Sequence, residues 1–180
     1  MWIELVAAAL FGLVVSVLFH GPVESAVVRI FGPLAPAGRS RSVKGMWHSY
    51  YEIVKDGSQP SPPGTPLDPS RIEQIKLSQV GTSIIGKNDK RSRRYFLRLT
   101  LDDGCILTGR WSDVSGGRYH YGGVQLRWDY SGRYMIGKFV GRDRHNQIKH
   151  GPWAFARIPT DLQEVVDEWR SEVRRTGHTS

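Results

Sequence analysis

The sequence predicts a mainly β protein: a small eight-stranded antiparallel up-and-down β-barrel, preceded by an N-terminal transmembrane helix and followed by a C-terminal amphipathic helix. Fifteen residues without a charge run from Leu5 to Phe19. From Gly45 onward, short runs of β-branched and aromatic residues alternate with glycine, asparagine and aspartate clusters, as expected for strands joined by tight turns. A glycine followed two positions later by a large aromatic also recurs in this part. Its copies are Gly45-Met46-Trp47, Gly109-Arg110-Trp111, Gly137-Lys138-Phe139 and Gly151-Pro152-Trp153.

Length and charge define the domain organisation. The 180 residues are enough for one domain with an N-terminal appendage. The net charge is +8, and residues 44–158 carry 19 Lys and Arg against 10 Asp and Glu. A basic folded domain attracts polyanions such as nucleotides and anionic lipid headgroups. The predicted segments are a transmembrane anchor (1–22), an amphipathic segment and basic linker (23–43), the barrel (44–158), and a C-terminal helix and tail (159–180).

The apolar run near the N-terminus predicts a membrane anchor. It is at the short end of a membrane span, which needs about 20 apolar residues. No Lys or Arg precedes it, whereas a signal peptide usually begins with basic residues. The cations follow the run, so the positive-inside rule places the barrel in the cytoplasm. A cleaved signal peptide and a helix packed against soluble protein are the alternatives. Residues 23–34 form an amphipathic continuation that lies in the membrane interface or extends the first helix.

The strand pattern predicts closure into a barrel. The eight predicted strands are 47–53, 71–80, 82–86, 95–101, 105–111, 119–128, 134–140 and 147–157. Asp56 to Pro69 is rich in proline and predicts a loop or a lid, because proline cannot join a central strand. Closing the sheet removes its unpaired edges. The interior of an eight-stranded barrel holds side chains or one small ligand.

A helix is predicted after Pro159. Thr160 with Gln163, or Asp161 with Glu164, offers a capping pair. Apolar residues then recur at helical spacing and predict a face that covers one end or wall of the barrel, with the anchor segment or a second subunit as alternative partners. These residues are Leu162, Val165, Val166, Trp169 and Val173.

Strand alternation also selects candidate binding residues. The side chains that it assigns to the barrel interior are Trp47, Ser49, Tyr51, Leu97, Leu107, Trp111, Phe139, Trp153, Phe155 and Arg157. A ligand with phosphates and bases needs cations and aromatic rings. The candidate ligand-binding residues, inside or at the rim, are Ser49, Tyr51, His120, Tyr121 and Arg157. Structural roles remain open for them: Tyr51, for example, is also placed to act as a core ring.

The densest basic run predicts a surface turn. It consists of Lys87, Lys90, Arg91, Arg93 and Arg94. It is either a solvated hairpin tip or a contact for lipid headgroups or nucleic acid. The sequence does not predict an enzyme: its six histidines lack metal-ligand spacing, and no nucleophile motif or phosphate-binding glycine loop occurs. We therefore expect no catalytic residue, metal or cofactor.

Two resemblances add expectations about function. Gly45-Met46-Trp47 at the start and Arg157 at the end of the strand series resemble the calycin arrangement of lipocalins and fatty-acid-binding proteins. In that family the arginine packs across the first-strand tryptophan, so the resemblance implies that Arg157 caps Trp47. The order of membrane helix, basic linker and small barrel resembles the membrane-anchored β-barrel effectors of bacterial CBASS anti-phage defence (SMODS-associated, lipocalin-like barrels). This second resemblance runs through the four glycine–aromatic motifs together with Tyr119-His120-Tyr121-Gly122 and Gly137-Lys138-Phe139-Val140-Gly141.

The second resemblance implies a mechanism. A cyclic dinucleotide or trinucleotide would bind in or over the barrel mouth and make the chains form a homo-oligomer that disrupts the inner membrane. The chain would be a single-pass inner-membrane protein in contact with the lipid bilayer through residues 1–34, and no long nucleic acid would be a partner. This sequence departs from those effectors, which usually have two transmembrane segments. The alternative is a non-enzymatic, membrane-anchored scaffold whose basic surface docks protein or anionic lipid.

Overall fold

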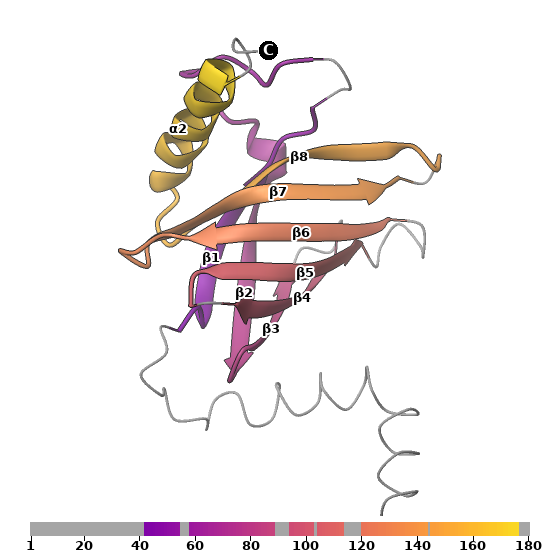
Figure 1. Ribbon diagram of the computed structural model, residues 1–180, viewed down its shortest axis with the longest axis vertical. Coiled ribbons are helices and arrows are strands. Elements are labelled where there is room, and N and C mark those ends of the chain that lie inside the picture. Colours follow the sequence, from indigo (N-terminus) through magenta and orange to yellow (C-terminus); the bar gives the residue numbers. More distant parts are fainter. Residues whose placement is uncertain are drawn as a thin grey trace, which may run out of the picture.

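The computed structural model describes residues 42–54, 58–88, 94–102, 104–113, 120–143 and 145–176. In them, eight antiparallel strands close into a barrel in which each strand pairs with its sequence neighbours and the last pairs with the first (Figure 1). This confirms the predicted mainly β class and its C-terminal helix. The elements are β1 (Gly45–Tyr51), the 3-10 helix η1 (Pro69–Arg71), β2 (Ile72–Val80), β3 (Ser83–Asn88), β4 (Tyr95–Asp102), β5 (Ile106–Asp113), β6 (Tyr121–Trp128), β7 (Tyr134–Arg142), β8 (Ile148–Ala156) and α2 (Asp161–Thr176).

The predicted anchor and linker, within residues 1–41, lie outside the described residues. Within the described part of the chain, no helix combines the length and the apolar character needed to cross a bilayer. The transmembrane helix therefore stays a prediction. The strands run from Gly45 to Ala156, inside the range that the sequence assigns to the barrel.

Strand ends differ from the prediction where polar residues extend the pairing. The prediction that a turn begins at Lys87 is wrong, because Lys87 and Asn88 belong to β3. Asn88 donates to the carboxylate of Glu73 (2.6 Å) and accepts a hydrogen bond from the backbone N–H of Tyr95 (2.7 Å), which fixes it between neighbouring strands. β7 continues two residues beyond its predicted end because Arg142 pairs with Ile148 on β8.

Side chains fill the barrel interior. Buried residues alternate with less buried ones along β2 and β4, as strand parity predicts, whereas Ala154 and Ala156 on the outer face of β8 are also buried because α2 covers them. At one end, Trp47 donates its indole N–H to the carbonyl oxygen of Val43 (2.7 Å). The guanidinium of Arg157 lies 3.9 Å from the ring centroid of Trp47 and donates to the carbonyl oxygen of Lys44 (3.0 Å). The predicted capping of Trp47 by Arg157 is confirmed.

Glycines let the strands bend around this aromatic interior. Gly137 lies directly opposite Trp153, and Gly151 lies directly opposite Phe139, so each ring covers a neighbour without a side chain. A Cβ at Gly137 would collide with the backbone of β6. The glycine–aromatic repeat is therefore explained by close backbone approach and barrel curvature.

Helix α2 covers the outside of the barrel, beside β7 and β8 (Figure 1). The buried residues that form this contact come from α2 and from the outer faces of β1 and β8. They are Leu162, Val165 and Val166 on α2, with Tyr50, Ala154 and Ala156 on the strands. The helix thus covers a wall, one of the two locations that its apolar stripe predicts.

A buried ion pair joins α2 to the segment before β2. Arg170 is 1% exposed, and its Nη2 donates to Glu52 Oε2 at 2.8 Å. Its Nη1 donates to the carbonyl oxygen of Thr65 (2.7 Å) and to Asp167 (3.0 Å). Gln163 also donates to the Thr65 carbonyl oxygen (3.1 Å). The described part of the predicted proline-rich loop is therefore fastened to the helix.

Candidate functional site at the barrel mouth

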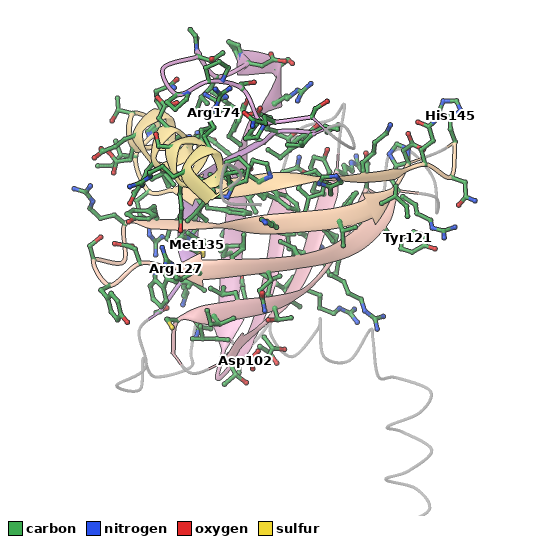
Figure 2. The ribbon with its side chains drawn as sticks, turned by 45° about the horizontal axis from the view of Figure 1, so that its top comes forward. Asp102, Tyr121, Arg127, Met135, His145 and Arg174 are labelled. Carbon is green, nitrogen blue, oxygen red and sulfur yellow. The ribbon has the colours of Figure 1, made fainter. Side chains whose placement is uncertain are left out.

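The mouth is the end of the barrel at which β1, β3, β5 and β7 finish and β2, β4, β6 and β8 begin. Figure 2 shows Tyr121 and His145 at this end, while Arg127 and Met135 lie toward the other. The opposite end is capped by Arg157 over Trp47. The mouth is therefore the end at which an additional molecule could reach the interior.

Five aromatic rings pack together inside the mouth. They are Tyr51, Tyr95, Trp111, Phe139 and Trp153. Their centroids lie 5.9–6.4 Å apart in edge-to-face geometry, which is the spacing of rings in contact. A ligand would consequently bind over this cluster, or enter after its rings rearrange.

Polar side chains surround the cluster. Glu73 and Asn88 are nearly fully buried and hydrogen-bonded to each other. Asp113 is buried, with its carboxylate 3.7 Å from Nδ1 of His120. The hydroxyl groups of Tyr51 and Tyr95 lie 3.4 Å apart. The mouth thus combines flat apolar rings with hydrogen-bonding groups, which is the usual composition of a small-molecule site.

Three buried nitrogens at the mouth have no hydrogen-bond partner among the described residues. They are Nε1 of Trp111, Nε1 of Trp153 and Nε2 of His120. Leaving a buried polar group unsatisfied costs about 1–3 kcal/mol. The indole nitrogens can only donate. A ligand with acceptor atoms near its rings would satisfy them.

The carboxylates described inside the mouth would repel an anionic ligand. Glu73 and Asp113 are carboxylates, and Arg71 is a cation 5.9 Å from the Tyr51 centroid. The sequences of the mouth connections contain further cations, which lie outside the described residues. They are Lys55, Lys90, Arg91, Arg93, Arg118 and Arg144.

The predicted site residues fall into three places. Tyr51 and His120 lie at the mouth, and Ser49 is buried between Tyr51 and Trp47, opposite Glu73. Tyr121 follows His120 but faces outward and is 55% exposed. Arg157 lies at the capped end. The structure therefore places Ser49 and Tyr51 on the inward face of β1 and His120 beside Asp113, while Tyr121 faces outward and Arg157 lies at the other end.

The sequence analysis did not select the polar residues that complete the mouth: Glu73, Asn88 and Asp113. Strand parity could have indicated Glu73, because it shares the inward face with Ile75 and Leu77. A carboxylate at an inward position of a strand marks a polar site, since unpaired charges are rarely buried. Within the described ranges, no group of three or more His, Cys, Asp or Glu side chains is arranged to hold a metal ion.

Comparisons with known proteins identify no family. No protein-family profile matches the chain, and no curated protein matches it. A solved structure of a redesigned β-barrel aligns with a TM-score of 0.43 at 16% identity, covering 68% of this chain and 97% of that one. Transferrin Binding Protein B from Haemophilus parasuis Hp5, in a Trp-176-Ala mutant, aligns with a TM-score of 0.35 at 12% identity, covering 62% of this chain and 25% of that one.

Proposed function

We propose that this protein is a membrane-anchored, non-enzymatic β-barrel effector of CBASS anti-phage defence, whose mouth binds a small anionic ligand, a cyclic dinucleotide or trinucleotide. Ligand binding would make the chains oligomerise and disrupt the inner membrane. The observation that carries the proposal is the pair of unpartnered indole N–H groups, Trp111 and Trp153, inside an aromatic cluster at the mouth. Nucleobases supply both planar rings and acceptor atoms.

The charges at the mouth favour separate contacts for the bases and the phosphates of the ligand. Tyr51, Trp111 and Trp153 suit bases, since stacking contributes about 1–3 kcal/mol per base. The carboxylates of Glu73 and Asp113 suit the amino groups of bases, and they disfavour phosphates. The phosphates would therefore contact the cations of the connecting segments. The anchor at residues 1–22 and the cytoplasmic, inner-membrane location belong to the same proposal and rest on the apolar run and the cations that follow it.

Thermal unfolding of the full-length chain with a panel of cyclic dinucleotides and trinucleotides tests the function. A ligand at 100 times its Kd stabilises the folded state by about 2.7 kcal/mol, which corresponds to a Tm increase of roughly 5–10 °C for a chain of this size. Trp111→Phe and Trp153→Phe keep a ring but remove the N–H donor, so the shift should shrink. Trp128→Phe, near the opposite end of β6, is the matched control and should keep it. If no cyclic oligonucleotide shifts the Tm at saturation, the proposal is wrong.

The alternative is a scaffold whose interior takes no ligand. The contact between the five rings favours it, because a filled interior needs no occupant. In that case the outer surface of the barrel would be the working surface, and the Tm would respond to no cyclic oligonucleotide.

A further inference from the structure

The outer wall is the set of outward-facing side chains on β2 to β7. Strand register and exposure place seven cations on it: Lys76, Lys87, Arg98, Arg110, Arg127, Lys138 and Arg142. Among the described strands, the outer wall contains a single carboxylate, Asp102, at the last position of β4. The buried carboxylates Glu73 and Asp113 face the interior. The cations of the outer wall are thus separated from the anionic groups of the same strands.

Two like-charged pairs lie directly opposite each other on the outer wall. Lys76 pairs with Lys87 across β2 and β3, and Arg98 pairs with Arg110 across β4 and β5. Side chains at such positions are about 5 Å apart at Cβ, and like charges there destabilise a sheet. Among the described residues, no carboxylate forms an ion pair with Lys76 or Arg110. An external anionic partner would remove this repulsion.

Aromatic and apolar side chains occupy the same rows as the cations. Phe96 lies between the like-charged pairs, 5.5 Å from Lys87 Nζ and 5.7 Å from Arg98 Cζ, measured from its ring centroid. In the strand register, the positions that follow Phe96 on the next strands are Ser112, Tyr121, Arg142 and Ile148. Tyr121, Val140 and Ile148 are 55%, 52% and 57% exposed. The outer wall is therefore amphipathic as well as basic.

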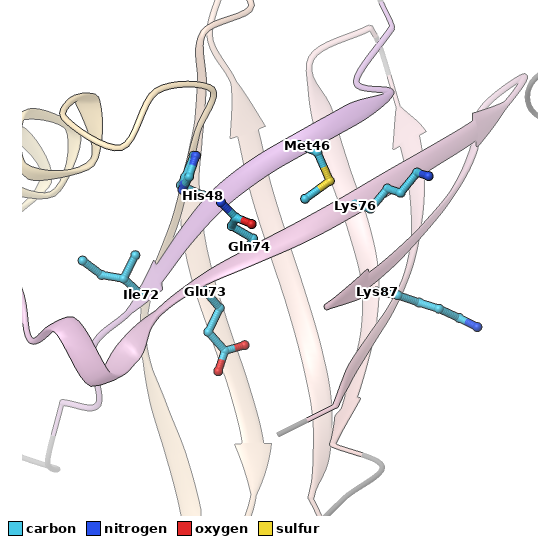
Figure 3. Close-up of a pocket in the computed structure, with 7 residues that line it drawn as sticks. All are labelled: Met46, His48, Ile72, Glu73, Gln74, Lys76 and Lys87. Carbon is cyan, nitrogen blue, oxygen red and sulfur yellow. The ribbon is translucent and has the colours of Figure 1, made fainter. Parts of the chain in front are cut away.

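A groove continues the outer wall onto β1. It measures about 440 Å³ and is lined by Met46, His48, Ile72, Glu73, Gln74, Lys76 and Lys87. Figure 3 shows Lys76 and Lys87 extending toward the same side, with Met46 beside them. Helix α2 packs on β8, β7 and β1. It therefore leaves the basic side chains of β2 to β6 uncovered.

We propose that the side of the outer wall formed by β5, β6 and β7 docks onto an anionic lipid bilayer, with Arg110, Arg127, Lys138 and Arg142 at the headgroups and Tyr121 and Val140 in the interface. Such a surface uses both features, because cations attract anionic headgroups and tyrosine and apolar side chains insert beside them. A nucleic acid would use the cations but leave the exposed aliphatic side chains unused. This inference goes beyond ligand sensing and does not depend on it.

A fluorescent probe on the outer wall tests the docking. In a full-length Cys105→Ser background, a single cysteine is introduced by Thr108→Cys on β5, where Thr108 is exposed, or by Glu168→Cys on α2 as the control position. The labelled chains are mixed with vesicles of phosphatidylcholine alone or with added phosphatidylglycerol, each containing a headgroup-linked quencher. We expect quenching at position 108, increased by phosphatidylglycerol, and little at position 168. The increase should fall at high salt.

Charge variants identify the responsible residues. Arg110→Gln with Lys138→Gln should reduce the phosphatidylglycerol-dependent docking equilibrium roughly thirtyfold, at about fivefold per cation. Arg133→Gln with Arg175→Gln removes the same charge from outside the outer wall and should change it little. Equal quenching in both kinds of vesicle, or equal losses in the two double variants, would overturn the proposal. Displacement of the vesicles by a single-stranded oligonucleotide that binds the outer wall more tightly would assign the wall to nucleic acid instead. Melting shifts with cyclic oligonucleotides report on the mouth, so the two proposals can fail separately.

Discussion

Arg170 shows how a single charged residue determines local structure. Its guanidinium is almost completely buried and bonds to Glu52, Asp167 and the carbonyl oxygen of Thr65. Burial alone would raise the pKa of Glu52, but the hydrogen bonds from Ser61 and Arg170 hold that pKa below its ordinary value. Since the folded state favours ionised Glu52, the pair contributes stability above the unfolded pKa of about 4.3. That contribution is lost as the pH falls through the lower folded pKa.

Arg170→Met should test this pair. Removing one partner of a buried ion pair leaves an uncompensated charge, so the free energy of unfolding at pH 7 should fall by about 3–5 kcal/mol. The variant should also lose less stability than the wild type on acidification below about pH 4.3, because its Glu52 no longer has a cation that favours ionisation. Denaturant unfolding at a series of pH values measures both effects. Arg175→Met, on the exposed side of α2, is the control, and equal losses would argue against a special role for Arg170.

This pair could not be predicted from the sequence. Arg170 follows Asp167 by three residues, which on a helix resembles an ordinary solvent-exposed pair. Its main partner, Glu52, is 118 residues away in sequence. Strand alternation and helical periodicity report which face a side chain occupies, but they contain no information about a polar contact between distant elements.

At the scale of elements, strands such as β2 and β4 were predictable because their residues alternate in burial. In β4, Leu97, Leu99 and Leu101 are buried, and the residues between them are not. Likewise, the rings of Trp111 and Trp153 were correctly assigned to the interior. The mouth was less predictable, because Asn88 looks like a turn residue and His120 and Tyr121 face different sides where β6 begins. Strand alternation predicts side-chain direction less well at strand ends, because the same residue types also form turns.

Alanine substitutions test whether glycine is needed where the strands bend. A Cβ at Gly137 would overlap the backbone of Gln125 and Leu126, which cannot move as a flexible side chain can. We expect Gly137→Ala to reduce the free energy of unfolding by about 1–3 kcal/mol, as overpacking does. At Gly123 the nearest atoms to a new Cβ are 3.9 Å away, so Gly123→Ala should change stability by less than about 1 kcal/mol. Urea unfolding of both variants provides the comparison, and similar losses would contradict this explanation of the bends.

At the scale of the whole molecule, charge is distributed by face. The interior of the mouth has two carboxylates, while the outer wall has seven cations. Strand parity predicts the outward direction of Arg98, Arg110 and Arg127, and it could have indicated the inward direction of Glu73, but which of these residues share one side of the barrel depends on the strand register. A surface retained for binding commonly reduces the stability of the free protein.

Arg110→Glu should therefore stabilise the free protein. It replaces a like-charged pair with an opposite-charged pair between Arg98 and Glu at position 110, which contributes about 0.2–1 kcal/mol in a cross-strand pair. Calorimetry should show a Tm increase of roughly 1–4 °C at low salt, diminishing at high salt. Lys138→Glu, which makes the same two-unit change of charge at a position paired with Gln125 and Pro152, is the control. A lower Tm for Arg110→Glu would show that the two arginines do not repel each other appreciably.

The seam between β1 and β8 has only four paired positions, His48 to Tyr51, the shortest strand contact in the described barrel. Helix α2 packs over this seam through Tyr50 and Ala154, and Arg170 ties it to Glu52, just beyond β1. During synthesis, β1 leaves the ribosome before the other strands, whereas its partner strand β8 and the helix that covers the seam follow all of them. A nascent chain must therefore keep an open sheet edge until β8 and α2 have both been made.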